Sequence, residues 1–527
     1  MIVGAGMAGL TAAAYLARNN YDVLLLERND RSGGLVGTFE KNGFFFDSGP
    51  RAFVNSGIVK PILKDLGIDC NYLQNSISLG IENHLFKINS INDLQEYQRV
   101  LGELYPEDRA EISVIIKYMD RLSKYTQVLY EFDNPNFSNQ MNDKDYIFKR
   151  LLPWMMKFLH AMKKLNDFNL PIEAFLGNLT KNRSLIDILI QHFFRGTPTS
   201  FALGYFYVYM DYFYPKGGTG TLHHLLRERI DKLGGEIKLN TPITEVIPAE
   251  SRIVDSKGVS YSYDQLIWCA DLKSLYRNLN TTGLEPNIKQ KIESESSRVL
   301  ASKGAESVFI INLAVNRNSS FFRKNGGEHL FFTPSKDGLK STLREDREDI
   351  VRNFAQKSKE EILEWLDRYI NLNTYEISIP VLRDSTLAPE GQTGVMISFL
   401  FDYEIFKKVE EAGWYSEFKD EVESRICDLL DRTIYKGLKD DILFKFSATP
   451  LTIQKMSGSS EGAIVGWTFE KTPPVVNRLK DIPKSVNTTI PEVYQAGQWA
   501  YSPAGVPIAM LTGWYAAQKI IKLAKKK

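Results

Sequence analysis

Cysteine and histidine are scarce in this chain. It has three cysteines (Cys70, Cys269 and Cys427) and six histidines, of which only His223 and His224 are adjacent. No pair has the spacing of a metal site, so we predict that the protein binds no metal. So few cysteines fit a reducing compartment, and we expect a cytoplasmic protein. No apolar run reaches the roughly 18 residues of a membrane-spanning helix. We expect no signal peptide in this chain, and whether residues or a targeting segment precede Met1 stays open.

An excess of charge of either sign is also missing. The 65 Lys and Arg balance the 64 Asp and Glu, so we expect no nucleic acid as a partner. Two common catalytic motifs are absent as well, namely the Walker loop and His-Glu-x-x-His. The hydrophobic fraction of 43% is ordinary for a globular protein, and 527 residues are too many for one simple core. We therefore expect two domains.

The most informative stretch is a glycine-rich turn at the N-terminus. Residues 4–9 read Gly-Ala-Gly-Met-Ala-Gly, and an alanine-rich segment that favours a helix follows at 10–18. A strand is predicted at 21–26, and Glu27 ends it. Such a unit offers backbone N–H groups and a helix N-terminus to a diphosphate, while the acid accepts ribose hydroxyls. The sequence therefore predicts a dinucleotide site.

The following residues distinguish FAD from a nicotinamide dinucleotide. Residues 28–50 read RNDRSGGLVGTFEKNGFFFDSGP. They resemble the second signature of the large FAD family that contains amine oxidases, protoporphyrinogen oxidases and phytoene desaturases. In that family an Arg and a Gly-Gly pair follow the ribose acid, and here these are Arg31, Gly33 and Gly34. Simple nicotinamide dehydrogenases lack this extension, so the resemblance implies FAD.

Two later stretches carry the same resemblance. Residues 214–247 resemble the segment that returns the chain to the nucleotide domain, where the backbone of Ile243 would meet the adenine. Residues 493–521 resemble the flavin loop and closing helix of the family, with Gln498 in place of the acid usual after Gly497. The helix beginning near Val506 would direct its N–H groups at the flavin O2 and stabilise negative charge on the reduced ring.

One turn narrows the resemblance to a branch. Asp384, Ala388, Pro389 and Gly391 resemble a turn of the phytoene desaturase branch, which also includes carotenoid isomerases and retinol saturases. General amine oxidases lack this turn. We expect its role to be architectural, because Pro389 and Gly391 favour a turn between two strands.

The resemblance also implies a set of site residues. Non-covalent FAD would lie against residues from both ends of the chain: Gly4, Ala5, Gly6, Met7, Ala8, Gly9, Glu27, Arg28, Arg31, Gly33, Gly34, Leu35, Gly49, Pro50, Arg51, Ile243, Gly497, Gln498, Gly505, Val506 and Pro507. Arg51 and Glu461 are the polar side chains that the family pattern places near the ring, and they are the catalytic candidates. A cofactor contact or a structural role is the alternative for each.

The expected fold is of the α/β class. We predict an FAD-binding, Rossmann-like (doubly wound) domain built from the discontinuous segments 1–60, 214–300 and 440–527. The remaining segments, 61–213 and 301–439, would form a substrate-binding domain with a mixed sheet, helices and a helical cap facing a membrane.

Two stretches suggest an apolar partner. Residues 201–214 hold eight aromatic residues, which would line a lipid tunnel or fill the core of the cap. Residues 144–165 have an apolar stripe (Leu151, Met155, Phe158 and Met162) among basic residues. Such a helix lies in a membrane interface or packs against its own protein. We predict a peripheral contact with the inner face of a membrane.

These observations favour a phytoene desaturase-like oxidoreductase. It would desaturate, saturate or isomerise carbon–carbon bonds of a long apolar isoprenoid or polyene. A flavin amine oxidase or protoporphyrinogen oxidase is the rival enzyme, and the turn at 384–391 argues against it. A prenyl-lipid escort protein without redox chemistry is the rival of another class, and the complete flavin pattern argues against it. The exact substrate, the reaction direction, the electron acceptor or donor and the oligomeric state stay open.

Overall fold

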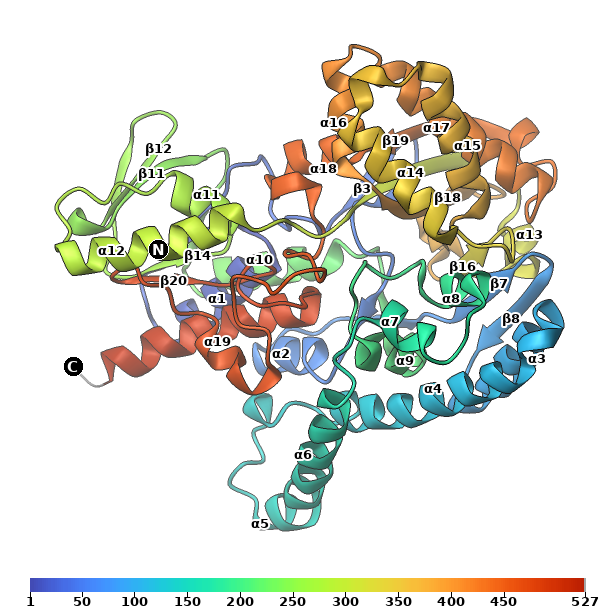
Figure 1. Cartoon of the computed structure of the whole chain (residues 1–527). Helices are drawn as coiled ribbons and strands as arrows, with labels where there is room; N and C mark the ends of the chain where they lie inside the picture. The colour runs from blue at the N-terminus through green and yellow to red at the C-terminus, as the bar shows by residue number, and fades with distance from the viewer. Residues whose placement is uncertain (526–527) are drawn as a thin grey trace.

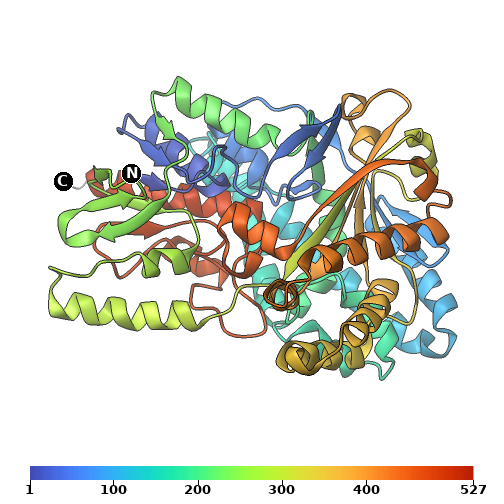
Figure 2. The ribbon, with the colours of Figure 1, turned by 90° about the horizontal axis from the view of Figure 1, so that it is seen from above.

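The computed structural model describes residues 1–525 and contains two large sheets with helices packed on and between them (Figure 1). The five-stranded sheet is entirely parallel, in the order β10-β2-β1-β14-β20. Its strands come from distant parts of the chain: β1 (Ile2–Val3), β2 (Leu24–Leu26), β10 (Glu236–Lys238), β14 (Leu266–Trp268) and β20 (Val493–Gln495). Both termini lie on this side of the molecule, as two perpendicular views agree (Figures 1 and 2).

Helices cover the parallel sheet as expected for an α/β fold. They are α1 (Met7–Arg18), α10 (Thr221–Lys232) and α19 (Val506–Ala524). The predicted helix at 10–18 begins three residues earlier, since Gly6 in extended backbone serves as its N-cap. The predicted strand at 21–26 is shorter and covers only Leu24–Leu26. Fully buried alanines on α1 let the helices approach the sheet closely.

The seven-stranded sheet is mixed, in the order β19-β15-β18-β17-β16-β7-β8. Its strands are β7 (Ile77–Ile81), β8 (His84–Ile88), β15 (Ser307–Val315), β16 (His329–Thr333), β17 (Tyr375–Ser378), β18 (Thr393–Phe401) and β19 (Ile442–Ala448). One face packs apolar side chains against α15 (Lys359–Leu372), α16 (Tyr403–Glu411) and α17 (Tyr415–Arg432). Because side chains alternate along a strand, His329 and Glu376 share the opposite face with Ser398.

A helical layer lies beside β7 and β8. It includes α3 (Leu94–Leu104), α4 (Arg109–Tyr130), α8 (Arg183–Ile190) and α9 (Thr199–Val208), joined in one apolar core with those strands. Smaller sheets complete the fold: β3 (Thr38–Lys41) with β4 (Phe44–Asp47), β11 (Ile243–Ile247) with β12 (Arg252–Asp255) and β13 (Ser260–Ser262), and β9 (Tyr212–Pro215) between β5 (Phe53–Val54) and β6 (Tyr72–Gln74).

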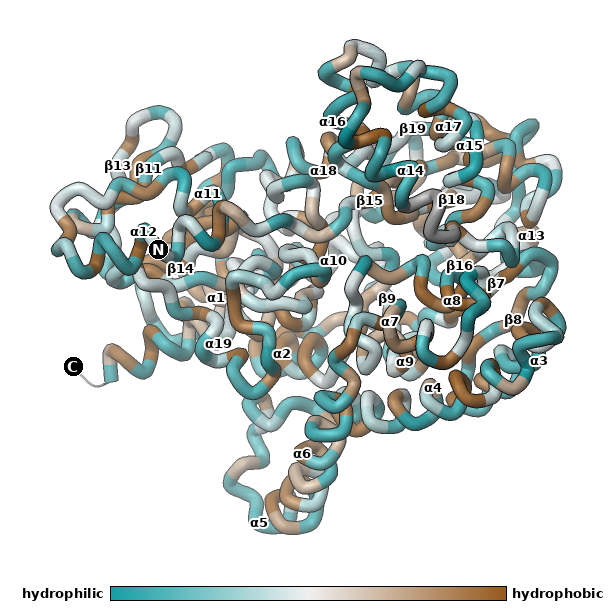
Figure 3. Tube along the Cα trace, in the orientation of Figure 1, coloured by the Kyte–Doolittle hydropathy of each residue, from teal (hydrophilic) through white to brown (hydrophobic). Residues whose placement is uncertain are grey.

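The predicted amphipathic helix protrudes from the body of the molecule (Figure 1). Short α5 (Lys144–Tyr146) continues through a π-helical turn (Ile147–Leu151) into α6 (Leu152–Asn166). The predicted stripe is wrong in part, because Leu151 is buried and Phe158 packs on Trp154. Hydrophobic and hydrophilic residues both occur along the protrusion (Figure 3), and its most exposed apolar side chains are Phe148, Leu152, Met155, Met156 and Leu159.

The predicted domain boundaries stay a prediction. One strand of the predicted third segment 440–527, β19, pairs with β15 in the seven-stranded sheet rather than joining the parallel sheet. This pairing argues for beginning that segment after Ala448.

Candidate flavin site and apolar cavity

The glycine turn at the carboxyl end of β1 has one tight part and one open part. Gly4 has a φ of +99°, and a Cβ added to Gly9 would lie 1.9 Å from the Gly4 carbonyl oxygen. A Cβ on Gly6, in contrast, would meet nothing within 4 Å. No side chain caps α1, so the N–H groups of its first turn, at Met7 and Ala8, are available to an anion. The fold requires two of the glycines, whereas the third leaves space for a ligand.

The Gly-Gly loop lies directly on this turn. The Gly33 N–H donates to the Ala5 carbonyl at 2.8 Å, and a Cβ on Gly34 would lie 3.2 Å from the Gly6 Cα. Leu35 and Gly49, two further residues predicted for the site, are also in close contact, since a Cβ on Gly49 would lie 1.8 Å from the Leu35 carbonyl oxygen. Pro50, the next residue along the chain, is half-buried. Three segments that the sequence predicted as one site are therefore in contact.

His223 of α10 adds a neutral ring to this region. Its Nδ1 lies 3.3 Å from the Ser32 Oγ, and a Cβ on Gly33 would touch the ring. Burial, followed by the charges of His224 and exposed Arg31, lowers the pKa of His223 to about 3. The sequence had predicted Arg31 but not His223.

Glu27 ends β2 and is 5% exposed. Its Oε2 accepts from the Ala5 N–H at 2.7 Å and its Oε1 from the Asn29 N–H at 2.9 Å. Burial raises the pKa of this carboxyl. A carboxylate has about four acceptor positions, so both oxygens can still accept from ribose hydroxyls. The Thr241 N–H donates to the Glu27 carbonyl, which brings the start of β11 at Ile243 close to the acid.

Arg28 points away from the glycine turn. Its Nη2 donates to the Lys455 carbonyl at 2.9 Å, at the end of α18 (Pro450–Ser457). It therefore joins the nucleotide region to the segment that leads into Glu461.

The C-terminal loop closes the site from the other side. Gly497 follows β20 with a φ of +99°, and its N–H donates to the Thr512 Oγ1 at 2.9 Å. Gly505 is extended before α19, and Val506 and Pro507 begin that helix without a side-chain cap. A Cβ on Gly513 would lie 2.3 Å from the Ala8 oxygen, so α19 and α1 meet at backbone distance.

Gln498, which stands where the family usually has an acid, contacts other groups of the protein. The Gln498 Nε2 lies 3.4 Å from the Ser459 Oγ and 3.4 Å from the Ala463 carbonyl. These long contacts connect the C-terminal loop to the segment that contains Glu461. The residues of both chain ends thus fit a dinucleotide.

Glu461, one of the catalytic candidates, is held in an ion pair. Its Oε1 accepts from the Lys273 Nζ at 2.7 Å and its Oε2 from the Gly304 N–H at 2.5 Å. The Lys273 side chain is 4% exposed, and the backbone of Glu461 is left-handed with a φ of +59°. Both carboxylate oxygens are engaged, which favours the structural alternative. No motif in the sequence pointed to Lys273.

Arg51, the other candidate, lies in a buried polar cluster on the inner face of the seven-stranded sheet. It is 1% exposed, and its Nη1 donates to the Asp47 carbonyl at 2.9 Å. The Arg383 Nη1 donates to the Arg51 carbonyl at 3.1 Å, and the Arg383 guanidinium stacks on the Tyr214 ring at 4.0 Å. Nearby, Glu376 accepts from the His329 Nε2 at 2.9 Å. The sequence predicted Arg51 only, because strand register assembles the rest.

An apolar cavity lies between this sheet and the helical layer. Its lining consists of Leu79, Gly80, Ile81, Tyr97, Met119, Ile188, Leu189, His192, Phe193, Ala202, Leu203, Tyr205, Phe206, Tyr209, Phe331, Thr333 and Thr374. The His192 Nε2 lies 3.1 Å from the Tyr209 hydroxyl, and burial lowers the pKa of His192 to about 4. The lining therefore carries no charge near neutral pH. Only part of the aromatic stretch 201–214 faces the cavity, and Phe213 belongs to the core beneath α1.

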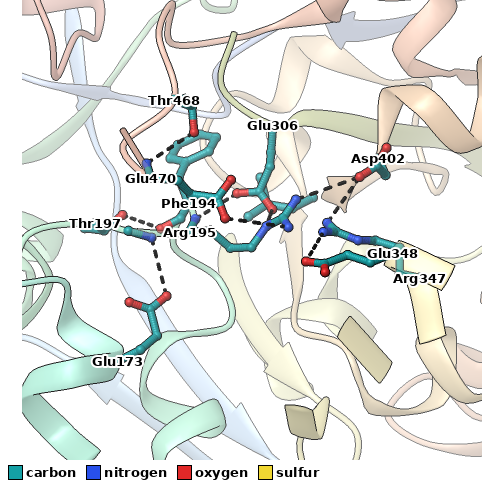
Figure 4. A network of polar contacts seen from close by, with 12 residues as sticks. Glu173, Phe194, Arg195, Thr197, Glu306, Arg347, Glu348, Asp402, Thr468 and Glu470 are labelled. Atoms are coloured by element: carbon teal, nitrogen blue, oxygen red, sulfur yellow. Dashed lines mark hydrogen bonds and ion pairs between the residues drawn. The ribbon is translucent and has the colours of Figure 1, made fainter. Parts of the chain in front are cut away.

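An arginine network joins the helical layer to the sheet (Figure 4). The Arg195 Nε donates to Glu306 at 2.7 Å, and Arg195 also lies 3.8 Å from Asp402 and 3.9 Å from Glu470. Arg347 of α14 (Lys340–Arg352) pairs with the same Asp402 at 3.1 Å. The segment after α8 is thereby fixed to the ends of β15 and β18, which keeps the cavity walls together.

Two desaturases are similar to this chain along almost its whole length. A 4,4'-diapophytoene desaturase of Staphylococcus haemolyticus is 20% identical, with 99% of this chain and 98% of the relative covered. A 1-hydroxycarotenoid 3,4-desaturase of a Flavobacterium species is 21% identical over the same shares. Among solved structures, wild-type putrescine oxidase bound to putrescine has a TM-score of 0.58 at 14% identity, covering 99% of this chain and 98% of that one.

A second solved structure agrees with this fold. An oxidoreductase from Methanosarcina mazei has a TM-score of 0.58 at 14% identity, and 99% of each chain is covered. The predicted fold class is thus confirmed. The family profile described as flavin containing amine oxidoreductase matches residues 7–521. Because this match spans nearly the whole chain, the protein belongs to the flavin containing amine oxidoreductase family and is a flavin-dependent oxidoreductase.

Proposed function

We propose that the protein uses non-covalent FAD to oxidise, reduce or isomerise carbon–carbon bonds of a long apolar isoprenoid or polyene. The observation that carries this proposal is the cavity lining, which has aromatic and aliphatic side chains but no Asp, Glu, Lys or Arg. A protonated amine in such a cavity would have no counter-charge, and an unpaired buried ion is strongly disfavoured. The desaturase relatives point to the same substrate class.

The chain's own residues would supply binding and orientation. The N–H groups at the starts of α1 and α19 would hold the diphosphate and the flavin O2, and Glu27 would hold a ribose. The bound flavin would supply hydride transfer at N5. The aromatic walls would align an extended polyene and exclude water, while the Arg195 network would hold those walls in place.

The test compares two substrate classes on the purified, flavin-loaded protein. Under anaerobic conditions a long polyene should change the flavin absorption band of the oxidised or the reduced enzyme, and putrescine should not. The mass of the polyene product gives the direction: a loss or gain of two hydrogens identifies a desaturase or a saturase, and no change in mass an isomerase. Rapid flavin reduction by the amine, with no response to polyenes, would contradict the proposal.

We further propose that the α5–α6 protrusion contacts an anionic membrane surface. Met156 is 75% exposed and Phe148 is 65% exposed, and Lys149, Arg150, Lys157, Lys163 and Lys164 lie on the same protrusion. No helix within residues 1–525 is long and apolar enough to cross a bilayer, so an interfacial contact is the available geometry. Basic residues near an anionic surface each contribute about 1 kcal/mol.

Flotation with anionic vesicles at low salt tests this contact. Lys157, Lys163 and Lys164 changed together to Glu should abolish binding and leave the flavin content unchanged. The same reversal at Lys289, Lys291 and Lys324, which are exposed elsewhere, is the matched control and should have little effect. A parent protein that never floats, or a triple variant that floats equally well, would refute the membrane contact.

A further inference from the structure

Two neighbouring buried arginines have donors without acceptors. The Arg51 Nε and Nη2 and the Arg383 Nε are shielded from solvent and make no hydrogen bond within the described residues. The two side chains are adjacent, because Arg383 donates to the backbone of Arg51. Buried guanidinium groups in folded proteins are paired, so these three nitrogens indicate an acceptor that the polypeptide does not provide.

The acidic groups nearby are already engaged. The Asp47 carboxylate accepts from the Tyr214 hydroxyl at 2.7 Å and from both the N–H and the hydroxyl of Thr219 at 2.9 Å. The Glu376 carboxylate accepts from His329 at 2.9 Å and from Ser398 at 3.0 Å. Neither carboxylate forms an ion pair with either arginine among the described residues, so the free donors face a ligand of other origin.

The arginine pair lies beyond one end of the apolar cavity. Phe331 lines the cavity, and its ring centroid is 5.5 Å from that of His329, the partner of Glu376. Tyr205 also lines the cavity, and its hydroxyl lies 2.5 Å from that of Tyr212, whose ring is 5.6 Å from His329. Two ring contacts therefore connect the cavity lining to the polar cluster.

We propose that Arg51 and Arg383 bind an oxygen-bearing end group, an aldehyde or a carboxylate, of the long apolar molecule that the cavity holds. The inference rests on the proposed function and adds that the substrate is oxygenated at one end rather than a plain hydrocarbon. Guanidinium donors match both groups, and a carboxylate accepts two parallel hydrogen bonds from one guanidinium. A hydrocarbon leaves the donors unpaired, and sites of this kind discriminate strongly against such analogues. The flavin carbonyls are the other source of oxygen acceptors.

Ligand binding to the flavin-loaded protein distinguishes these sources. Quenching of tryptophan fluorescence is measured with a polyene hydrocarbon and with its terminal aldehyde and terminal acid of the same chain length. The parent should bind the two oxygenated ligands at least about tenfold more tightly, as expected for a hydrogen bond to a charged donor. Arg51→Met and Arg383→Met should remove this preference while hydrocarbon affinity stays unchanged, and Arg383→Met should also keep the flavin content of the parent. Arg99→Met, on the exposed face of α3, is the control.

The outcomes separate the inference from the proposed function. Equal affinity of the parent for all three ligands would overturn the inference, and so would a preference that survives both substitutions. Loss or spectral change of the flavin in Arg51→Met, with an unchanged ligand preference in Arg383→Met, would assign the donors to the cofactor. If Arg51→Met does not fold, the ligand preference is measured on Arg51→Lys instead and compared with the order of affinities that the parent shows. Failure of the parent to bind any of the polyenes would refute the proposed function itself.

Discussion

Backbone atoms build the candidate site on the five-stranded sheet, whereas side chains build the one on the seven-stranded sheet. At the parallel sheet, glycines bring N–H groups and helix ends to a common edge, and Glu27 is the main functional side chain. On the larger sheet, Arg51, His329, Glu376 and Arg383 meet across strands and loops that are far apart in the sequence.

This difference determines how each site responds to substitution. A site built from backbone atoms depends on the absence of side chains. A side chain added to one of its glycines destabilises the fold where protein atoms are close, and it blocks the ligand where the space is open. A site built from side chains depends on charged groups that the fold removes from water. Replacing one of these groups changes stability or binding through its burial and its ion pairs. The glycine turn and the buried acids provide the sharpest contrasts.

The largest expected effect is that of Gly9→Val. The new Cβ would lie 1.9 Å from the Gly4 carbonyl oxygen, a backbone atom that cannot move without separating α1 from the sheet. We expect a loss of about 3 kcal/mol or more in unfolding free energy, in the range of severe steric changes in a core. Thermal unfolding monitored by circular dichroism should show this with and without added FAD. A Gly9→Val protein as stable as the parent would mean that α1 packs differently.

Gly6→Val should instead spare the fold and remove the cofactor. Nothing in the protein lies within 4 Å of the new Cβ, and Gly6 has a φ of −72°, which any residue adopts. The side chain would occupy the space that we assign to the diphosphate. The purified variant should be colourless and as stable as the parent stripped of flavin. If it retains the yellow colour after gel filtration, the diphosphate lies elsewhere.

Glu27→Ala should have an intermediate effect on FAD binding. The substitution removes charge-assisted hydrogen bonds worth about 1.5–3 kcal/mol, which corresponds to a rise in Kd of about 10- to 150-fold. It also frees the N–H groups of Ala5 and Asn29, so a small loss of stability should accompany it. Titration of the apoprotein with FAD measures the Kd, with Asp30→Ala, an exposed neighbour, as control. An unchanged Kd would remove Glu27 from the site.

The sequence predicted the site on the parallel sheet better than the site on the seven-stranded sheet. Local spacing was enough for the turn at 4–9 and the helix after it, because this motif constrains its own backbone, and the resemblance to the flavin family predicted the C-terminal helix near Val506. The flavin family followed from these motifs and is confirmed by the match over residues 7–521. The assignment of individual residues to FAD stays a prediction.

The side-chain site was largely invisible in the sequence. His329 and Glu376 come together only through the pairing of β16 with β17, and no motif encodes that register. Lys273 and Glu461 pair across 188 residues of sequence. The helix at 144–166 was predictable, but its inward face was not, because the burial of Leu151 depends on the rest of the fold.

The smallest expected effect concerns Asp211, the half-buried acid that precedes β9. Its carboxylate accepts from the Ser56 N–H at 2.6 Å, and burial raises its pKa to about 6. The folded pKa is higher than the unfolded value, so this group's stabilising contribution is complete below about pH 4 and is lost as pH rises through about 6. At neutral pH the charged carboxylate therefore lowers stability. Asn keeps the acceptor without the charge.

Asp211→Asn should therefore stabilise the protein at about pH 8 by roughly 1 kcal/mol, seen as a rise in Tm of about 1–2 °C. The gain should shrink steadily toward about pH 5, where the parent carboxyl becomes protonated. Asp120→Asn on the exposed face of α4 is the matched control and should show no such pH dependence. Because Asp211 contacts the loop that follows Arg51, flavin content should be compared in parallel. A variant less stable than the parent at about pH 8 would show that the charge of Asp211 is compensated in the folded protein.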